Sequence, residues 1–223
     1  MNYLAHALPF LERPYFAAAT GVPDWLMVAD RKVRLRRKHV DAFLADPARA
    51  ADPTTVAVAE GVRQHLRDDA VFHGTRIFAE TSLQLTVLAR DALQRDQGFR
   101  PGFLGHLLTE VLLDAALAAE RPQRLDAYYR MLASVEPVAI EDVVNRVAPR
   151  RTERLAPLIA GFCEQRILFD YLEDGKLMVR LNQVMRRVRL PELPEPFREI
   201  LPPARQLVTD RRGALLAGTP CGG

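Results

Sequence analysis

The chain has 223 residues, of which 48% are hydrophobic and 26% charged, so its composition is that of a globular protein and excludes disordered and collagen-like classes. Its 31 Lys and Arg against 28 Asp and Glu give a formal net charge of only +3. Basic character is therefore a property of particular segments and not of the chain as a whole. Cys163 and Cys221 lie far apart in the chain and support neither a disulfide framework nor a cysteine zinc site.

Apolar residues recur at three- and four-residue spacing, and long alternating runs of Val, Ile and Thr are absent. This pattern predicts an all-α fold, a compact multi-helix bundle in which Pro and Gly separate the helices. In chain order we expect helices over 2–11, 23–31, 36–46, 54–73, 75–95, 101–120, 122–134, 139–147, 150–173, 175–188 and 196–210.

Three prolines at 191, 194 and 196 interrupt the helical pattern, because proline lacks the amide proton and restricts the residue before it. We therefore predict one all-helical domain over 1–189, followed over 190–223 by a proline-rich connection, a docked helix and a flexible tail. We expect no membrane span, since no apolar run reaches the roughly 18 to 20 residues that one requires, and no signal peptide, since the N-terminus lacks its basic region. The expected location is cytoplasmic.

The segment 101–120 is apolar almost all round, which is typical of a helix buried in a core. Its polar exceptions, His106, Glu110 and Asp114, are spaced i, i+4, i+8 and form one stripe. Buried carboxylates cost several kcal/mol each unless a counter-charge or a bound cation compensates them. We therefore expect positive charge to face this stripe.

A second stripe follows the helix predicted at 54–73, where His65, Asp69 and His73 have the same spacing. Two helices with these stripes facing each other would offer the nitrogen and oxygen ligands that suit manganese, iron or zinc. The alternative is a purely structural polar network. Asp68 should point to a different face from Asp69.

Two further residues are candidate ligands. His6 lies near the start of an apolar helix, although a lone histidine is more often a core or capping residue. Asp24 lies where a helix should begin and could equally be its N-cap. The full set of predicted metal ligands is His6, Asp24, His65, Asp69, His106, Glu110 and Asp114.

Basic residues gather in the run 31–38. Such a run is usually a solvated surface, but it could dock an acidic or phosphate-bearing partner. Nucleic acid is disfavoured, because no recognised motif is present and aromatic residues are not interleaved with the basic ones. Arg63 and Arg67 could hold a substrate phosphate, with surface pairing to Glu60 as the simpler alternative.

Four segments carry a resemblance to a known family. In order they are Met1-Asn2-Tyr3-Leu4-Ala5-His6, Gly21-Val22-Pro23-Asp24-Trp25, Gly61-Val62 leading to His65 and Asp69, and Glu110-Val111-Leu112-Leu113-Asp114. They resemble acyl carrier protein phosphodiesterases, which belong to the helical HD-domain metal-dependent phosphohydrolases. The resemblance covers chiefly the first 120 residues.

The chain departs from that family pattern at several places, which marks a divergent member. Pro23-Asp24-Trp25 replaces the Ala-Asp-Phe of the family and retains the acid. Two further departures change the residue type. His73 stands where the family has Asp, and Asp114 is followed by Ala115 where the family has His. Both departures fall close to predicted ligands, and His106, one turn before Glu110, could compensate for the missing histidine.

The resemblance implies hydrolysis of the phosphodiester that links phosphopantetheine to acyl carrier protein, with a divalent ion, manganese first and iron or zinc next. Such an ion lowers the pKa of its bound water and neutralises charge on phosphoryl oxygens. The expected catalytic residues are His73, Asp69 and Arg67: a free carboxylate or His73 would take the proton of the water, and Arg67 would steady the phosphate. Because acyl carrier proteins are acidic, the run 31–38 is the expected partner surface.

Two other functions compete with this interpretation. One is a zinc-dependent lipid or nucleotide phosphoesterase, which the extra histidines His73 and His106 favour. The other is a non-catalytic helical binding or scaffold protein, in which the two stripes form a structural polar network.

Overall fold

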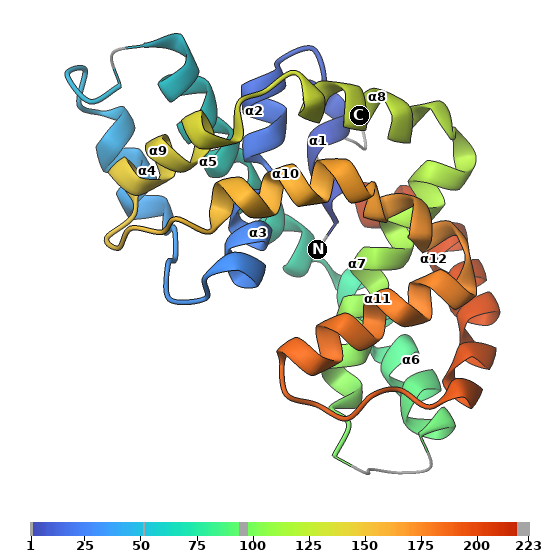
Figure 1. Ribbon diagram of the computed structural model, residues 1–223. Coiled ribbons are helices and arrows are strands. Elements are labelled where there is room, and N and C mark those ends of the chain that lie inside the picture. The colour runs from blue at the N-terminus through green and yellow to red at the C-terminus, as the bar shows by residue number, and fades with distance from the viewer. Residues whose placement is uncertain (1, 51, 94–97, 218–223) are drawn as a thin grey trace. The chain divides into compact units, whose positions relative to one another are not determined.

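Helices account for 77% of the chain in the computed structural model, which describes residues 2–50, 52–93 and 98–217 (Figure 1). Within those ranges there is no β-strand, so the predicted all-α fold is confirmed. Cys221, the last residues of the predicted tail and the end of the helix predicted at 75–95 lie outside the described residues.

The first half of the chain contains α1 (Tyr3–Ala7), the 3-10 helix η1 (Leu8–Phe10), α2 (Pro14–Ala19), α3 (Val22–Ala29), α4 (Arg37–Leu44), α5 (Pro53–His73), α6 (Arg76–Ala92) and α7 (Pro101–Glu120). The second half contains α8 (Gln123–Ala133), α9 (Pro137–Val147), α10 (Leu155–Gln165), η2 (Ile167–Leu172), α11 (Asp174–Arg187), η3 (Glu195–Ile200) and α12 (Leu201–Leu216).

Two helix predictions differ from the structure for identifiable reasons. The sequence pattern left 14–19 without a helix, yet α2 forms there because Pro14 occupies its first turn, where a missing amide proton costs nothing. The helix expected over 150–173 starts only at Leu155 and ends at Gln165. It ends there because Arg166 adopts a left-handed conformation with φ of 48°, which closes a helix.

The chain divides into two compact units. The first unit comprises Met1–Ala5, Val71–Gln123 and Ile167–Gly223, and the second comprises His6–Ala70 and Arg124–Arg166. The predicted boundary at residue 190 therefore falls inside the first unit. The observed divisions fall within α1 and α5, at the first residue of α8, and between α10 and η2.

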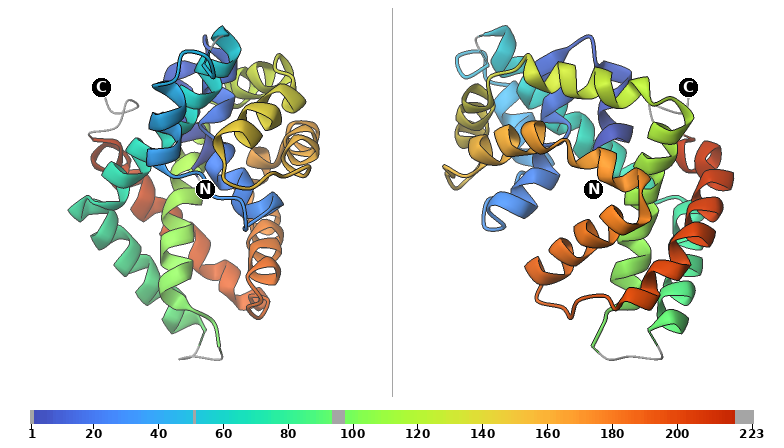
Figure 2. Two further views of the ribbon diagram at one scale, coloured as in Figure 1. Left: turned by 90° about the vertical axis from the view of Figure 1, so that its left-hand side faces the viewer. Right: turned by 45° about the vertical axis from the view of Figure 1, so that its right-hand side comes forward.

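In the first unit, α7 runs beside α6 and α12, as both views of Figure 2 show. Gly105 permits the close approach of α6, because a Cβ at this position would lie 2.7 Å from the backbone nitrogen of Thr86 and would also overlap the Ser82 carbonyl. The C-terminal helix is fixed to α7 by an ion pair of 3.0 Å between Arg212 and Glu120. The helix that bears the first polar stripe is therefore packed on two sides.

By length and composition, α7 could cross a membrane, which corrects the expectation that no apolar run is long enough. The core helix of a globular protein passes the same test, and 78% of the apolar window of α7 is buried. No other helix in the part of the chain that the structure describes meets these criteria.

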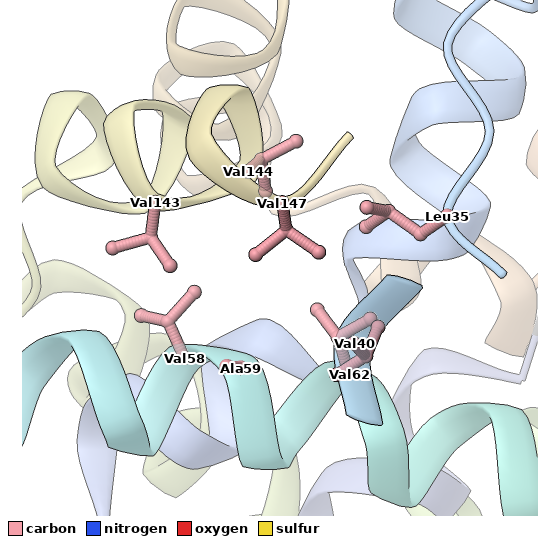
Figure 3. Close-up of a pocket in the computed structure, with 8 residues that line it drawn as sticks. All are labelled: Leu35, Val40, Val58, Ala59, Val62, Val143, Val144 and Val147. Atoms are coloured by element: carbon pink, nitrogen blue, oxygen red, sulfur yellow. The ribbon is translucent and has the colours of Figure 1, made fainter. Parts of the chain in front are cut away.

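In the second unit, α5 approaches α2 through Gly61, where a Cβ would lie 2.8 Å from the Cβ of Ala19 and would overlap the carbonyl of Phe16. Helix α9 covers another side of α5 through aliphatic side chains that face one another in Figure 3. The gap between them is too narrow to admit a water molecule, so it is packed core rather than a binding cavity. Its lining is Leu35, Val40, Val58, Ala59, Val62, Val143, Val144 and Val147.

Candidate metal centres

Three side chains of the second unit form what we call the His–His–Asp group: His6, His65 and Asp69. The one-turn spacing of His65 and Asp69 on α5 places them on one face of this helix, and α1 supplies His6. One ligand atom from each residue lies within 4.8 Å of the other two, and the imidazole centroids are 4.3 Å apart. Both histidines are buried, whereas Asp69 is partly exposed. The group is compact enough for one metal ion to reach all three side chains.

The two imidazoles of this group carry buried nitrogens without hydrogen-bond partners among the described residues, Nε2 of His6 and Nδ1 of His65. Burial, aided by the charge of His6, lowers the pKa of His65 to about 4, against the opposing charges of Asp24 and Asp69. His65 is therefore neutral at pH 7, which is the form that binds a metal. A buried polar atom without a partner costs about 1–3 kcal/mol, and a bound cation would remove that cost.

Asp68 belongs beside this group, although its position next to Asp69 suggested a different face. Its Oδ2 atom lies 3.9 Å from Nδ1 of His6, and Gln64 donates a hydrogen bond of 2.8 Å to its Oδ1 atom. A carboxylate beside the ring nitrogen that does not bind the ion can help to orient a metal-binding imidazole, and at 3.9 Å Asp68 would do so through its charge rather than through a direct hydrogen bond. The sequence signal that would have found Asp68 is its spacing of three residues from His65, which also places two side chains side by side on a helix.

Asp24 lies in the first turn of α3, where Gly21 is the N-cap residue, so the alternative role of Asp24 as the cap is not what the structure shows. Its negative charge partly offsets the effect of burial, which lowers the pKa of His65. Asp24 therefore contributes to the electrostatics of the His–His–Asp group without being one of its three clustered ligands.

Three side chains of the first unit form the His–His–Glu group: His73, His106 and Glu110. The Nε2 atoms of His73 and His106 lie 2.9 and 3.2 Å from the same carboxylate oxygen, Oε1 of Glu110. Burial raises the pKa of Glu110, but the positive charge of the amino terminus and hydrogen bonds from both imidazoles outweigh it and hold this pKa well below its usual range. Glu110 is therefore an anion stabilised by two imidazoles.

Asp114, the last residue of the α7 stripe, has a different set of partners. Its two carboxylate oxygens accept hydrogen bonds of 2.9 Å from the backbone N–H groups of Leu4 and Ala5. These groups belong to the first turn of α1, whose amides have no partner within that helix. Asp114 thus caps α1 from a distant part of the chain and lies in neither ligand group.

The seven predicted ligands are therefore distributed differently from the single facing pair of stripes that the sequence suggested. His6, His65 and Asp69 come together in one unit, and His106 and Glu110 come together in the other, joined by His73. His73 was predicted as a proton acceptor, and the structure gives it a hydrogen bond to Glu110. Asp24 and Asp114 join neither group.

The predicted phosphate-binding arginines have other surroundings. Arg63 lies 3.6 Å from Glu60, which is the surface pair given as the simpler alternative. Arg67 is exposed and lies two residues from both His65 and Asp69. Side chains two residues apart on a helix do not face each other, so Arg67 points away from the His–His–Asp group.

The basic run 31–38 extends between α3 and the first turn of α4. Val33 and Leu35 are buried, whereas the cationic side chains around them are exposed, as expected for a chain that covers the core with alternate residues. The exposed cations are Arg31, Lys32, Arg34, Arg36, Arg37 and Lys38.

Comparisons of the chain with protein-family models, with curated proteins and with solved structures find no match. The function proposed for either ligand group is therefore argued from the geometry and chemistry of its own residues.

Proposed function

We propose that the protein is a metal-dependent phosphohydrolase, specifically a phosphodiesterase, that binds its divalent ion at the His–His–Asp group. The observation that carries this proposal is the pair of buried imidazole nitrogens without hydrogen-bond partners, His6 Nε2 and His65 Nδ1, which lie in one cluster with the Asp69 carboxylate. Mixed imidazole and carboxylate ligands suit manganese, iron and zinc.

When bound, such an ion lowers the pKa of a coordinated water and neutralises charge on phosphoryl oxygens. His6 and His65 would hold it from the buried side, and the partly exposed Asp69 leaves the group open to a substrate. Asp24 would add negative charge near the ion without being one of the three clustered ligands, since its charge already acts on His65. Asp68 would keep the His6 ring in its binding orientation.

For the substrate we propose the phosphodiester of phosphopantetheinylated acyl carrier protein. Two observations support it. The segments that contain His6, Asp24, His65 and Asp69 resemble those of acyl carrier protein phosphodiesterases, and six exposed cations in 31–38 belong to the same unit as these residues. A cationic surface attracts an acidic protein and accelerates its association.

The test is hydrolysis by chelator-treated protein to which manganese is restored, with bis(p-nitrophenyl) phosphate and phosphopantetheinylated acyl carrier protein as substrates. Manganese-dependent hydrolysis that Asp69→Asn reduces at least 100-fold would support the proposal. Asp210→Asn is the matched control, because Asp210 is an exposed aspartate of α12 outside both ligand groups, and it should retain full activity. Equal activity of Asp69→Asn and the unsubstituted protein would contradict the proposal.

A second candidate function, a non-catalytic helical binding protein, is favoured by one observation. Glu110 and Asp114 both have hydrogen-bond partners within the protein, as a structural polar network requires. On this alternative, Asp69→Asn alters the free energy of unfolding, the protein binds no transition metal, and neither substrate is hydrolysed.

A further inference from the structure

We propose that the His–His–Glu group is a second metal site, of the zinc type, which fills independently of the His–His–Asp group. This inference concerns a different unit and a different ion from the proposed function and does not depend on it. Two histidines and one glutamate form the protein ligand set of a class of catalytic zinc sites, in which the fourth position is left to water or substrate.

The distances in this group are already close to those of a metal site. Ligands at 2.0–2.2 Å from a tetrahedral zinc ion lie about 3.3 Å from one another. The two imidazole nitrogens of His73 and His106 lie 2.9 and 3.2 Å from Oε1 of Glu110, and one ligand atom from each residue lies within 4.8 Å of the other two. The two imidazole-to-carboxylate distances therefore already lie within about 0.4 Å of that separation, and an ion could replace the protons shared with Glu110.

The side chains are also held in orientation before any ion binds. His106 and Glu110 lie one turn apart on α7, and His73 is the last residue of α5. Phe78 packs edge-on against both imidazoles, with ring centroids 4.7 Å from His73 and 5.0 Å from His106. Because the rings are already positioned, binding an ion would cost little side-chain entropy.

The three side chains of the group differ in their exposure to solvent. The side chain of Glu110 is 7% exposed, whereas those of His73 and His106 are 28% and 44% exposed. The carboxylate is therefore fixed inside the protein while the imidazoles remain within reach of solvent. This arrangement gives an ion an entry path and leaves room for a water or substrate ligand.

The ligand chemistry distinguishes this site from one for calcium or magnesium. Those ions take oxygen ligands almost exclusively, whereas two imidazoles with one carboxylate suit zinc, with copper, nickel and ferrous iron as competitors. The extra histidines His73 and His106, which depart from the resembled family, supply both nitrogen ligands. We therefore assign zinc to this group.

The experiment measures ion binding, not activity. Chelator-treated protein is titrated with zinc in a calorimeter, and cobalt replaces zinc to report tetrahedral coordination by its visible absorption. His106→Gln is the test variant, because His106 is partly exposed and glutamine retains a hydrogen-bond donor to Glu110. His39→Gln is the matched control, since His39 is the histidine that belongs to neither group.

We expect His106→Gln to bind one zinc ion fewer than the unsubstituted protein, or to bind that ion at least about 100-fold more weakly, since loss of even an outer-shell partner costs 10–100-fold. The control variant His39→Gln should bind zinc with the same stoichiometry and affinity as the unsubstituted protein. Equal stoichiometry and affinity for His106→Gln would overturn the proposal and leave the group as a hydrogen-bonded cluster. Circular dichroism and thermal unfolding verify that each variant is folded.

The two proposals fail in different ways. If Asp69→Asn abolishes hydrolysis but His106→Gln leaves zinc binding unchanged, the second site is excluded and the proposed function stands. If His106→Gln loses an ion while no substrate is hydrolysed, the zinc site stands without the function.

Discussion

Oδ2 of Asp68 lies 3.9 Å from Nδ1 of His6, whereas the other ring nitrogen of His6, the buried Nε2, has no hydrogen-bond partner in the described part of the chain. This distance exceeds that of a direct hydrogen bond, so the carboxylate acts on the ring mainly through its charge. The relationship gives Asp68 a positioning role that can be tested apart from the ligands themselves.

Asp68→Asn should weaken manganese binding at the His–His–Asp group by about 10–100-fold without abolishing it, because outer-shell partners of metal-binding histidines contribute by that factor. Asp69→Asn should have the larger effect, since it removes a ligand. Calorimetric titration with manganese measures both. Equal affinity of Asp68→Asn and the unsubstituted protein would exclude the positioning role.

The stability of the metal-free protein should fall as the pH is lowered from about 6.5 to about 4. The pKa of His65 is about 4 in the folded protein and has the ordinary value near 6.5 in the unfolded chain. The unfolded state therefore binds a proton in this window that the folded state does not bind, which favours unfolding. The contribution of His65 is present above pH 6.5, and its loss is on the order of 3 kcal/mol.

Urea unfolding at pH 7 and at pH 4.5 measures this effect, with His65→Leu as the reference because leucine does not titrate. The unsubstituted protein should lose more free energy of unfolding between the two pH values than the variant does. If both lose the same amount, His65 is not buried as a neutral imidazole.

Asp114→Ala should destabilise the protein by about 2–5 kcal/mol, because it leaves two buried backbone N–H groups of α1 without an acceptor. The number of metal ions bound should stay the same, since Asp114 belongs to neither ligand group. Denaturant unfolding and calorimetric titration with zinc and manganese check the two parts. Loss of an ion from a folded Asp114→Ala protein would show that Asp114 is a ligand.

Two glycines of α7 should respond in opposite ways to alanine. Gly105→Ala should lower the free energy of unfolding by about 1–3 kcal/mol, because the new Cβ would overlap the backbone of α6. Gly102→Ala, on the same helix, meets no atom within 4 Å and should be neutral or stabilising by up to about 1 kcal/mol. Thermal or urea unfolding of both variants provides the comparison. If the two variants change the free energy of unfolding by similar amounts, α6 is not packed closely on α7 at Gly105.

Features that depend on local helix geometry can be predicted from the amino-acid pattern. Apolar spacing predicts the all-α fold, and i, i+4 spacing places His65 beside Asp69 and His106 beside Glu110, because a helix brings every fourth side chain to the same face. Helix boundaries are not predicted by this spacing where a single residue sets them. Pro14 starts α2, and Arg166 ends α10.

The partners of the polar residues depend on contacts between segments that are far apart in the chain. His6 reaches His65 across 59 positions of sequence, and Asp114 binds the amides of Leu4 and Ala5 about 110 positions away. Helical spacing contains no information on such pairs, because it describes one helix at a time. The packing of separate helices sets these contacts, and it therefore decides whether a buried carboxylate caps a helix, binds imidazoles or lies beside a metal ligand.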